Sequence, residues 1–220
     1  MDLQLLRCPC GQDFPGEDRD QLYSAIRAHA DAVHPDLGLS DLNIRDFIEA
    51  SFRLSPVRPR LEVLPPLTIK RLTPELASDF FHFFDHEAFA GNPAWAGCYC
   101  VFPLFGGTPE EWGCRGAQQN RAEMAEYIAT GQVDGYLAYA GEQVAGWCHA
   151  GPRRRLRSLD YYPGHESPDP DHSGATACFI VAPPYRRHGI AEALLDAALE
   201  GFRAQGFRWA EGYPRKQEGL

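Results

Sequence analysis

The stretch that most restricts the fold of this chain runs from residue 178 to residue 207 and reads CFIVAPPYRRHGIAEALLDAALEGFRAQGF. Together with the residues just before it, its apolar start predicts a central strand over Ala175–Val181, which a Pro-Pro turn ends. Apolar residues at helical spacing predict a helix over Gly189–Gln205, closed by Gly206. The sequence therefore predicts a strand, a short basic loop and a helix in direct succession.

The loop between this strand and this helix has the properties of a phosphate-binding turn. A helix N-terminus presents unpaired backbone N–H groups and the positive end of the helix dipole, and both favour an anion. Gly189 lets the backbone approach a ligand closely, while Arg186 and Arg187 add positive charge. The spacing is neither GxGxxG nor GxxxxGKS. We favour a pyrophosphate site here over an ordinary basic turn.

Further predicted elements surround this segment. Strands are expected at Leu67–Leu72, at Phe207–Gly212, and as a hairpin at Tyr136–Tyr139 and Val144–Cys148. Helices are expected from Thr73 to about His86 and over Pro109–Thr130. Of the segments between them, we expect Ala88–Gly107 to be a structured loop and Arg153–Ser173 to be irregular.

Arg186-Arg187-His188-Gly189-Ile190-Ala191 resembles the R/Q-x-x-G-x-G/A signature of the GCN5-related N-acetyltransferase (GNAT) superfamily. The order of the predicted elements over roughly residues 67–213 is similar to that of the superfamily. The resemblance implies a GNAT-like α/β (α+β) fold, in which helices flank a mixed, mostly antiparallel sheet. It also implies an enzyme that transfers acetyl from acetyl-CoA to a primary amine.

The same resemblance implies roles for individual residues. The backbone of Phe179, Ile180 and Val181 would pair with the pantetheine arm, and a backbone N–H near Ile180 or Val181 would stabilise the developing oxyanion. The six residues that would hold the pyrophosphate through their amides are Arg186, Arg187, His188, Gly189, Ile190 and Ala191.

The catalytic acid and base are expected at the end of the last strand. Glu211 is the candidate base and Tyr213 the candidate acid for the departing thiolate. A carboxylate at a strand end is more often simply solvated. The alternative bases, which we leave unranked, are Asp160, Glu166, Asp169 and Asp171.

Three other groups of residues admit two interpretations each. Five residues form either an acceptor pocket or part of an ordinary core, namely Trp95, Cys98, Tyr99, Cys100 and Trp112. The thiols of Cys98, Cys100 and Cys114 could bind a metal, although buried structural thiols are the commoner case. His82 and His86 lie one helical turn apart without a third ligand. The run of Arg153, Arg154, Arg155 and Arg157 could attract the 3′-phosphate of the coenzyme or form a solvated loop.

The resemblance also implies that the sheet continues beyond Phe207–Gly212 with a helix and two more strands, whereas this sequence stops at Leu220. We expect a naturally short chain, a truncated sequence, or a homodimer that completes the sheet. A non-catalytic protein that binds CoA or docks a partner is therefore the alternative to an enzyme.

A composition break divides the chain. Four prolines in Arg53–Pro66 forbid a continuous helix and favour a stiff connector. We therefore predict a metal-binding module over residues 1–52, a linker over 53–66 and the acetyltransferase domain over 67–220. In the module, Asp18–Val33 and a segment capped by Ser40 or Asp41 are predicted helices.

The N-terminal module carries four ligands of the kinds that zinc prefers. Cys8 and Cys10 are separated by one residue before Gly11, and His29 and His34 follow at H-x4-H spacing. The arrangement resembles small predicted metal-binding proteins with a CxCG start and a late HxxxxH. A unit of about 50 residues also gains from a structural metal. We predict structural Zn²⁺ rather than two free thiols and a core histidine.

Charge and apolar patterning exclude several classes of protein. The net charge is −9, and residues 1–52 hold four Arg against ten Asp and Glu, so no basic footprint for nucleic acid is expected. No apolar run approaches the roughly 20 residues of a membrane span. The start lacks a secretion signal and the number of cysteines, seven, is odd, so we predict free thiols and a cytoplasmic location.

Overall fold

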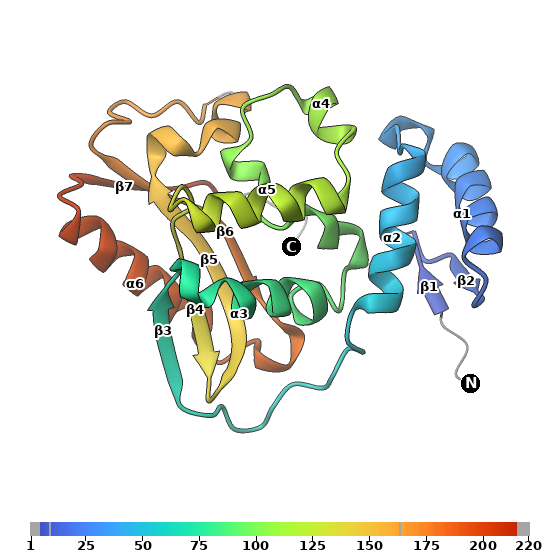
Figure 1. The fold of residues 1–220 in the computed structure, drawn as a ribbon, viewed down its shortest axis with the longest axis horizontal. Helices are drawn as coiled ribbons and strands as arrows, with labels where there is room; N and C mark the ends of the chain where they lie inside the picture. The colour runs from blue at the N-terminus through green and yellow to red at the C-terminus, as the bar shows by residue number, and fades with distance from the viewer. Residues whose placement is uncertain (1–4, 9, 163, 215–220) are drawn as a thin grey trace.

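The computed structural model describes residues 5–8, 10–162 and 164–214. They form a five-stranded mixed sheet flanked by helices, together with a smaller N-terminal unit at the opposite end of the molecule from the last helix (Figure 1). The predicted α/β fold, with helices flanking a mostly antiparallel sheet, is confirmed.

The strands of the large sheet lie in sequence order, and each pairs antiparallel with the next except the last two, which run parallel. They are β3 (Leu67–Arg71), β4 (Gly135–Ala140), β5 (Gln143–Pro152), β6 (Ser173–Val181) and β7 (Trp209–Gly212). All five predicted strands are present, and β5 extends four residues beyond its predicted end.

Side chains along each strand point alternately to the two faces of this sheet, and helices cover both faces. On one face, Gly146 of β5 lies against Leu194 of α6 (Ile190–Ala204). On the other, the neighbouring Trp147 is fully buried and its ring lies 5.1 Å from that of Phe80 in α3 (Ala77–His82). The large core therefore consists of two layers, one on each side of the sheet.

The prediction of a single helix over Pro109–Thr130 is wrong. The chain instead forms α4 (Pro109–Gly113) and α5 (Ala117–Ala129), separated by Cys114–Gly116. A capping box of Thr108 and Glu111 starts the first helix, and extended backbone at Gly116 (φ −98°, ψ 161°) starts the second. The helix expected to reach His86 ends its regular part at His82 and continues as a π turn over Phe83–Glu87.

The N-terminal unit packs two helices against a hairpin that sequence patterns did not predict. Asp18 caps α1 (Arg19–Val33), and Ser40 forms a capping box with Asn43 at the start of α2 (Asp41–Arg53). The hairpin consists of β1 (Leu5–Arg7) and β2 (Asp13–Pro15). A separate small core joins these elements, and its members are Leu6, Phe14, Leu22, Ile26, Ala30, Ile44 and Ile48.

The proline-rich segment that follows α2 has no helix or strand, and it is fastened to the large unit. Ser55 donates its backbone N–H to the carbonyl of His86 (2.8 Å). Leu61 donates to the carbonyl of Pro184, also over 2.8 Å, so the segment runs beside the turn that follows β6. Among the described helices, none combines the length and apolar character needed to cross a membrane.

The close packing of β4 on β5 generates a stability prediction at Gly135. A Cβ at this position would lie 2.6 Å from the carbonyl oxygen of Cys148 and closer still to the ring of buried Trp147. Gly135→Ala should therefore lower the free energy of unfolding by about 2 kcal/mol. Gly113→Ala is the matched control, because its Cβ would meet nothing within 4 Å and the change should have little effect. Urea denaturation of both variants measures the difference, and equal stabilities would contradict the packing described here.

Candidate functional site

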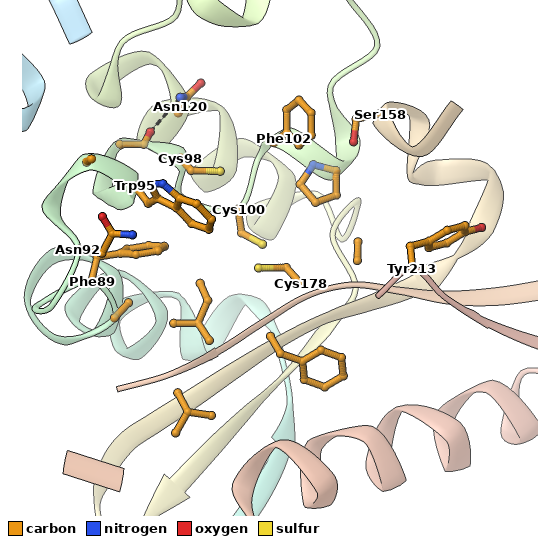
Figure 2. A pocket seen from close by; sticks show the side chains of 18 of the residues that line it. Phe89, Asn92, Trp95, Cys98, Cys100, Phe102, Asn120, Ser158, Cys178 and Tyr213 are labelled. Atoms are coloured by element: carbon orange, nitrogen blue, oxygen red, sulfur yellow. Dashed lines mark hydrogen bonds between the residues drawn. The ribbon is translucent and has the colours of Figure 1, made fainter. Parts of the chain in front are cut away.

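A large cleft of about 1780 Å³ opens where β6 separates from β7 (Figure 2). Typical small-molecule pockets span about 300–1,000 Å³, so this cleft has room for a coenzyme and a second ligand. Each of the following segments contributes some of the residues that line it: 43–47 of α2, 88–103, 112–120, 158–162, 177–181 of β6, 185–192 in the turn and first residues of α6, and 213–214, together with His165.

One wall of the cleft is an open strand edge. The parallel pairing of β6 with β7 ends at Thr176 and Gly212, whereas β6 continues to Val181 with β5 as its partner. Ala177–Val181, which include the predicted Phe179 and Ile180, line the cleft. An unpaired edge of this kind offers backbone N–H and C=O groups to an extended ligand.

The open edge leads directly into the predicted phosphate-binding turn. Gly189 adopts φ +77°, and a Cβ there would meet nothing within 4 Å, so the turn surrounds free space. In the described part of the chain, no side chain caps the first turn of α6, which leaves its N–H groups available to an anion. Arg186 donates from Nε to the carbonyl of Val181 (2.9 Å), which joins the turn to the strand edge.

Most of the residues predicted to bind the coenzyme line this one cleft. Those that do so are Phe179, Ile180, Val181, Arg186, Arg187, Gly189, Ile190 and Ala191. The exception is His188, whose Nε2 lies 3.0 Å from the carbonyl oxygen of Leu61 and whose ring is thereby engaged with the proline-rich segment. The strand edge and the uncapped helix together fit a ligand with an extended arm and a diphosphate.

Tyr213 lies at the other end of the open edge and lines the cleft (Figure 2). Its hydroxyl accepts from Nε of Arg153 (2.7 Å) and donates to Glu211. Burial and the neighbouring Glu211 carboxylate raise the pKa of Tyr213 to about 12. The phenol is therefore protonated at neutral pH, as a general acid has to be.

Glu211 lies behind Tyr213 and outside the cleft lining. Its carboxylate accepts hydrogen bonds from Ser167 and Tyr213, and one oxygen lies 3.5 Å from Nε of Arg153. Burial opposes ionisation of Glu211, but these hydrogen bonds and the charge of Arg153 outweigh it and lower the pKa. The arrangement suits a carboxylate that orients Tyr213 better than one that takes a proton.

The four alternative bases lie outside the cleft lining as well. Asp160 pairs with Arg153 (2.7 Å), Asp171 with Arg154, and Asp169 accepts from His172 (2.8 Å). Glu166 is exposed. Three of the four carboxylates therefore have structural partners.

The arginine run on the segment after β5 is buried at Arg153 and exposed at Arg154, Arg155 and Arg157, so the expectation of a solvated loop fits three of its four side chains. Arg153 is 2% exposed and lies between Asp160, Glu211 and Tyr213. Arg155 pairs with Asp134 (2.9 Å), and Arg157 donates to the carbonyl of Leu104 (3.0 Å). The run ties this segment to the sheet and to the loop beneath it.

Thiols gather where the open edge begins. Figure 2 shows the side chains of Cys100 and Cys178 directed toward one another, with Cys98 nearby. Trp147 donates from Nε1 to Sγ of Cys100 (3.2 Å), and His149 lies 3.4 Å from the same sulfur. Burial raises the pKa of Cys98 to about 11, so it is a neutral thiol. Cys114 is exposed and lies outside the cleft lining.

The predicted aromatic pocket is present in part. Trp95 and Trp112 line the cleft, together with Phe89 and Phe102, which the sequence interpretation did not single out. Tyr99 belongs to the core instead, where it is fully buried and donates to Asp85 (2.6 Å). Periodicity could not separate these cases, because both kinds of aromatic residue lie in the same irregular segment.

Helix α2 contributes a wall of the cleft that the sequence did not reveal. Asn43, Asp46 and Phe47 lie at i, i+3 and i+4 and all three line the cleft. Oδ2 of Asp46 accepts from the backbone N–H of Ala117 (2.6 Å), the first residue of α5. The N-terminal unit and the large unit therefore share this cavity.

The four predicted metal ligands lie together beside the turn of the N-terminal hairpin. Sγ of Cys8 lies 3.3 Å from Nε2 of His34, and Sγ of Cys10 lies 3.4 Å from Nε2 of His29. All four ligand atoms lie within 4.8 Å of one another. Gly11, with φ +98°, permits the tight turn that brings both sulfurs to the same side.

The spacing of these atoms fits a tetrahedral zinc site. Zn–S and Zn–N bonds of about 2.3 and 2.1 Å require a sulfur-to-nitrogen separation of about 3.5 Å across a tetrahedral edge, close to the two distances found. Four protein ligands fill the coordination shell, so such a metal has a structural role. By contrast, His82 and His86 face each other at 4.9 Å between ring centroids, and among the described residues they have no companion ligand.

Residues 106–214, nearly half of the chain, match the model of the acetyltransferase (GNAT) family. A search of curated proteins finds no match.

Several solved structures resemble the chain. They include aminoglycoside N-acetyltransferase AAC(6')-Iy in complex with CoA (15% identity, 70% of this chain and 81% of that chain, TM-score 0.43), a GCN5-related N-acetyltransferase from Ralstonia eutropha JMP134 (17%, 68% and 84%, 0.40) and a ribosomal-protein-alanine N-acetyltransferase from Brucella melitensis biovar Abortus 2308 (13%, 69% and 82%, 0.41).

The geometry of the four ligands predicts about one zinc ion per chain in protein purified without chelators. Cys10→Ser should abolish zinc retention and lower the stability of the N-terminal unit, because one ligand is lost. Cys114→Ser is the control, since this exposed thiol lies outside the ligand group. Elemental analysis measures the metal content. Metal-free wild-type protein with an unchanged circular dichroism spectrum would contradict the prediction.

Proposed function

We propose that this chain, whose residues 106–214 match the GNAT family, is an N-acetyltransferase that moves acetyl from acetyl-CoA to a primary amine. The observation that carries the proposal is the continuity of the open β6 edge with the uncapped N-terminus of α6 inside one cleft. That combination supports a donor with both a hydrogen-bonding arm and a diphosphate.

The donor would lie along β6. Backbone groups of Phe179, Ile180 and Val181 would pair with the pantetheine arm as an added strand does. The amides from Arg186 to Ala191, with the dipole of α6, would hold the pyrophosphate. Bound in this way, the thioester would reach the region of Cys178 and Tyr213, where β6 and β7 separate.

The transfer in this proposal is direct. The neutral amine attacks the thioester carbonyl, the carbon–sulfur bond breaks, and the departing CoA thiolate takes the phenolic proton of Tyr213. The nitrogen of the new amide loses one proton to solvent, and the Tyr213 phenolate regains one from solvent. Glu211 and Arg153 hold the Tyr213 hydroxyl in place. Glu211, the other candidate catalytic residue, acts through Tyr213, because its carboxylate oxygens are already engaged.

The N-terminal unit would hold zinc through Cys8, Cys10, His29 and His34 as a structural ion. The ion would fix the hairpin turn against α1. The seven free cysteines fit the reducing environment of the cytoplasm. A homodimer that extends the sheet at β7 stays a prediction.

Binding of acetyl-CoA tests the donor assignment. At a concentration 100 times its Kd, acetyl-CoA should stabilise the fold by about 2.7 kcal/mol, which raises the melting temperature by about 5–10 °C. Gly189→Asp should abolish this shift, because it adds a carboxylate where the diphosphate would lie. Differential scanning fluorimetry measures both.

The matched control for that variant is Gly206→Asp at the opposite end of α6. Gly206 has φ +80°, close to the +77° of Gly189, and neither Cβ would meet an atom within 4 Å. The two variants therefore carry the same backbone strain and the same added charge. A wild type without any shift, or a Gly206→Asp variant that loses it equally, would remove the donor assignment.

Tyr213→Phe tests the proposed acid. Loss of general acid catalysis should lower kcat about 100-fold and leave the melting shift with acetyl-CoA in place. Because the pKa of Tyr213 is about 12, the wild-type rate should show no loss from its deprotonation below pH 10. Tyr161→Phe is the control, since this hydroxyl donates to the carbonyl of Phe105 away from the cleft lining. Chromatographic measurement of CoA release gives the rates, and an unchanged kcat in Tyr213→Phe would exclude the acid role.

A further inference from the structure

Helix α2 has one buried face and one half-buried face, and the two serve different purposes. Ile44 and Ile48 pack into the small N-terminal core, as an amphipathic helix requires. The adjacent face presents Asp46 and Phe47 to the cleft of the large unit. A helix from outside the acetyltransferase fold therefore forms part of the wall of the proposed active site.

The position of this helix is fixed by several contacts with the large unit. Asp46 accepts from the N–H of Ala117 at the start of α5. A Cβ on Gly116 would lie 2.8 Å from Cδ2 of Leu42, so the backbone of the large unit comes close to α2 here. At the end of the helix, Arg53 donates from Nε to the carbonyl of Asp85 (3.2 Å). The wall is thus part of the folded structure.

Asp46 lies away from the point where the thioester would react. Its partner Ala117 packs against Gly97, because a Cβ on Gly97 would lie 3.3 Å from that of Ala117. The next residues in that segment, Cys98 and Cys100, face Cys178 at the open strand edge (Figure 2). The turn around residue 97 therefore lies between Asp46 and the reaction point.

The charges around the cleft make Asp46 a site for a cation. Two carboxylates line the cleft in the described part of the chain, and the other one, Glu192, belongs to the first turn of α6. Arg115, the nearest lining cation in sequence to Ala117, is already bonded to Glu123 and Asn120. Arg53 on the same helix also acts on Asp46 through its charge, but its Nε donates to the carbonyl of Asp85. Oδ1 of Asp46 has no hydrogen-bond partner among the described residues.

The surroundings of Asp46 favour an organic ammonium over a hydrated ion. Phe47 lies beside it on the same helix, α2 packs against the Pro93–Cys98 segment that carries Trp95, and both Phe89 and Trp95 line the cleft. Aromatic faces attract ammonium groups and pack against methylene chains. Burial raises the pKa of Asp46 despite the hydrogen bond from Ala117 and the charge of Arg53, so this carboxylate is incompletely solvated and gains from a further cationic partner.

We propose that Asp46 binds a second ammonium group of the acceptor, so that the substrate is an amine with a remote positive charge and an apolar segment between the two nitrogens. This inference rests on the proposed acetyltransferase function. The reacting amine would lie near Cys178 and Tyr213, and the aromatic lining would contact the apolar segment. Asp46 is thus a specificity-determining residue supplied by the N-terminal unit.

The probes are 1,8-diaminooctane and octylamine, which share an eight-carbon chain and differ in the second ammonium group. Their affinities for the full-length protein are measured by calorimetry in the absence of coenzyme. Wild type should bind the diamine about tenfold more tightly, as expected for one partly desolvated charge pair. Equal affinities, or no binding of either probe, would overturn the proposal.

Asp46→Asn isolates the charge, because the amide oxygen can still accept from Ala117. It should reduce the affinity for the diamine about tenfold and leave that for octylamine unchanged. Asp41→Asn is the control, since it removes an exposed charge from the same helix outside the cleft lining. An Asp46→Asn variant with wild-type diamine affinity, or an equal loss in Asp41→Asn, would contradict the role of Asp46.

These outcomes are separable from a failure of the proposed function. The melting shift with acetyl-CoA tests the donor site and involves no amine. If acetyl-CoA raises the melting temperature but the protein does not prefer the diamine, only the Asp46 proposal is removed. If acetyl-CoA gives no shift and the protein prefers the diamine, the acetyltransferase proposal is removed. Should Asp46→Asn fail to fold, the comparison of the two probes in wild type still decides.

Discussion

The separation of β6 from β7 is the constraint on which the proposed active site depends. The two strands pair up to Thr176 and Gly212, after which β6 has a strand partner on one side only within residues 5–8, 10–162 and 164–214. The free backbone groups of its other edge need a partner, and an extended ligand can supply one. Because α6 begins directly after the turn that ends β6, the same separation also directs a helix N-terminus into the cleft. One break in strand pairing thus creates both parts of the proposed donor site.

The N-terminal unit acts on this site through helix packing. Four protein ligands would leave a bound zinc ion no open position, so its effect on chemistry has to be mechanical. His29 and His34 lie on or just after α1, and α1 packs on α2 through Leu22, Ile26, Ile44 and Ile48. Through Asp46, α2 in turn holds the first amide of α5. A continuous path of packed elements therefore joins the metal ligands to the acceptor side of the cleft.

Sequence patterns predicted the parts of the site whose residues are close together in the chain. The strand, turn and helix of the donor site are contiguous, and the metal ligands fall within 27 residues of one another. Their roles follow from local geometry, namely a strand edge, a helix end and a tight turn. The cleft wall formed by α2 could not be predicted in this way, because the contact of Asp46 with Ala117 spans 71 residues. The break between α4 and α5 has the same origin, since Asp46 supplies the acceptor for the first N–H of α5 and so favours a new helix start there.

Arg153 shows how tertiary contacts decide the role of a residue that sequence leaves open. Its run of four arginines suggested either a phosphate patch or solvent exposure, yet its side chain is buried among a carboxylate, a phenol and a backbone carbonyl. A buried guanidinium needs such partners, because desolvation is costly and each missing partner leaves charge unpaired. Satisfying it positions Tyr213 at the mouth of the open strand edge and keeps Glu211 ionised beside it. The requirement to neutralise one buried cation thus fixes the geometry of the proposed acid. In a similar way Asp46 on α2, whose Oδ2 is held by Ala117, keeps its Oδ1 for the proposed cation at the other end of the cleft.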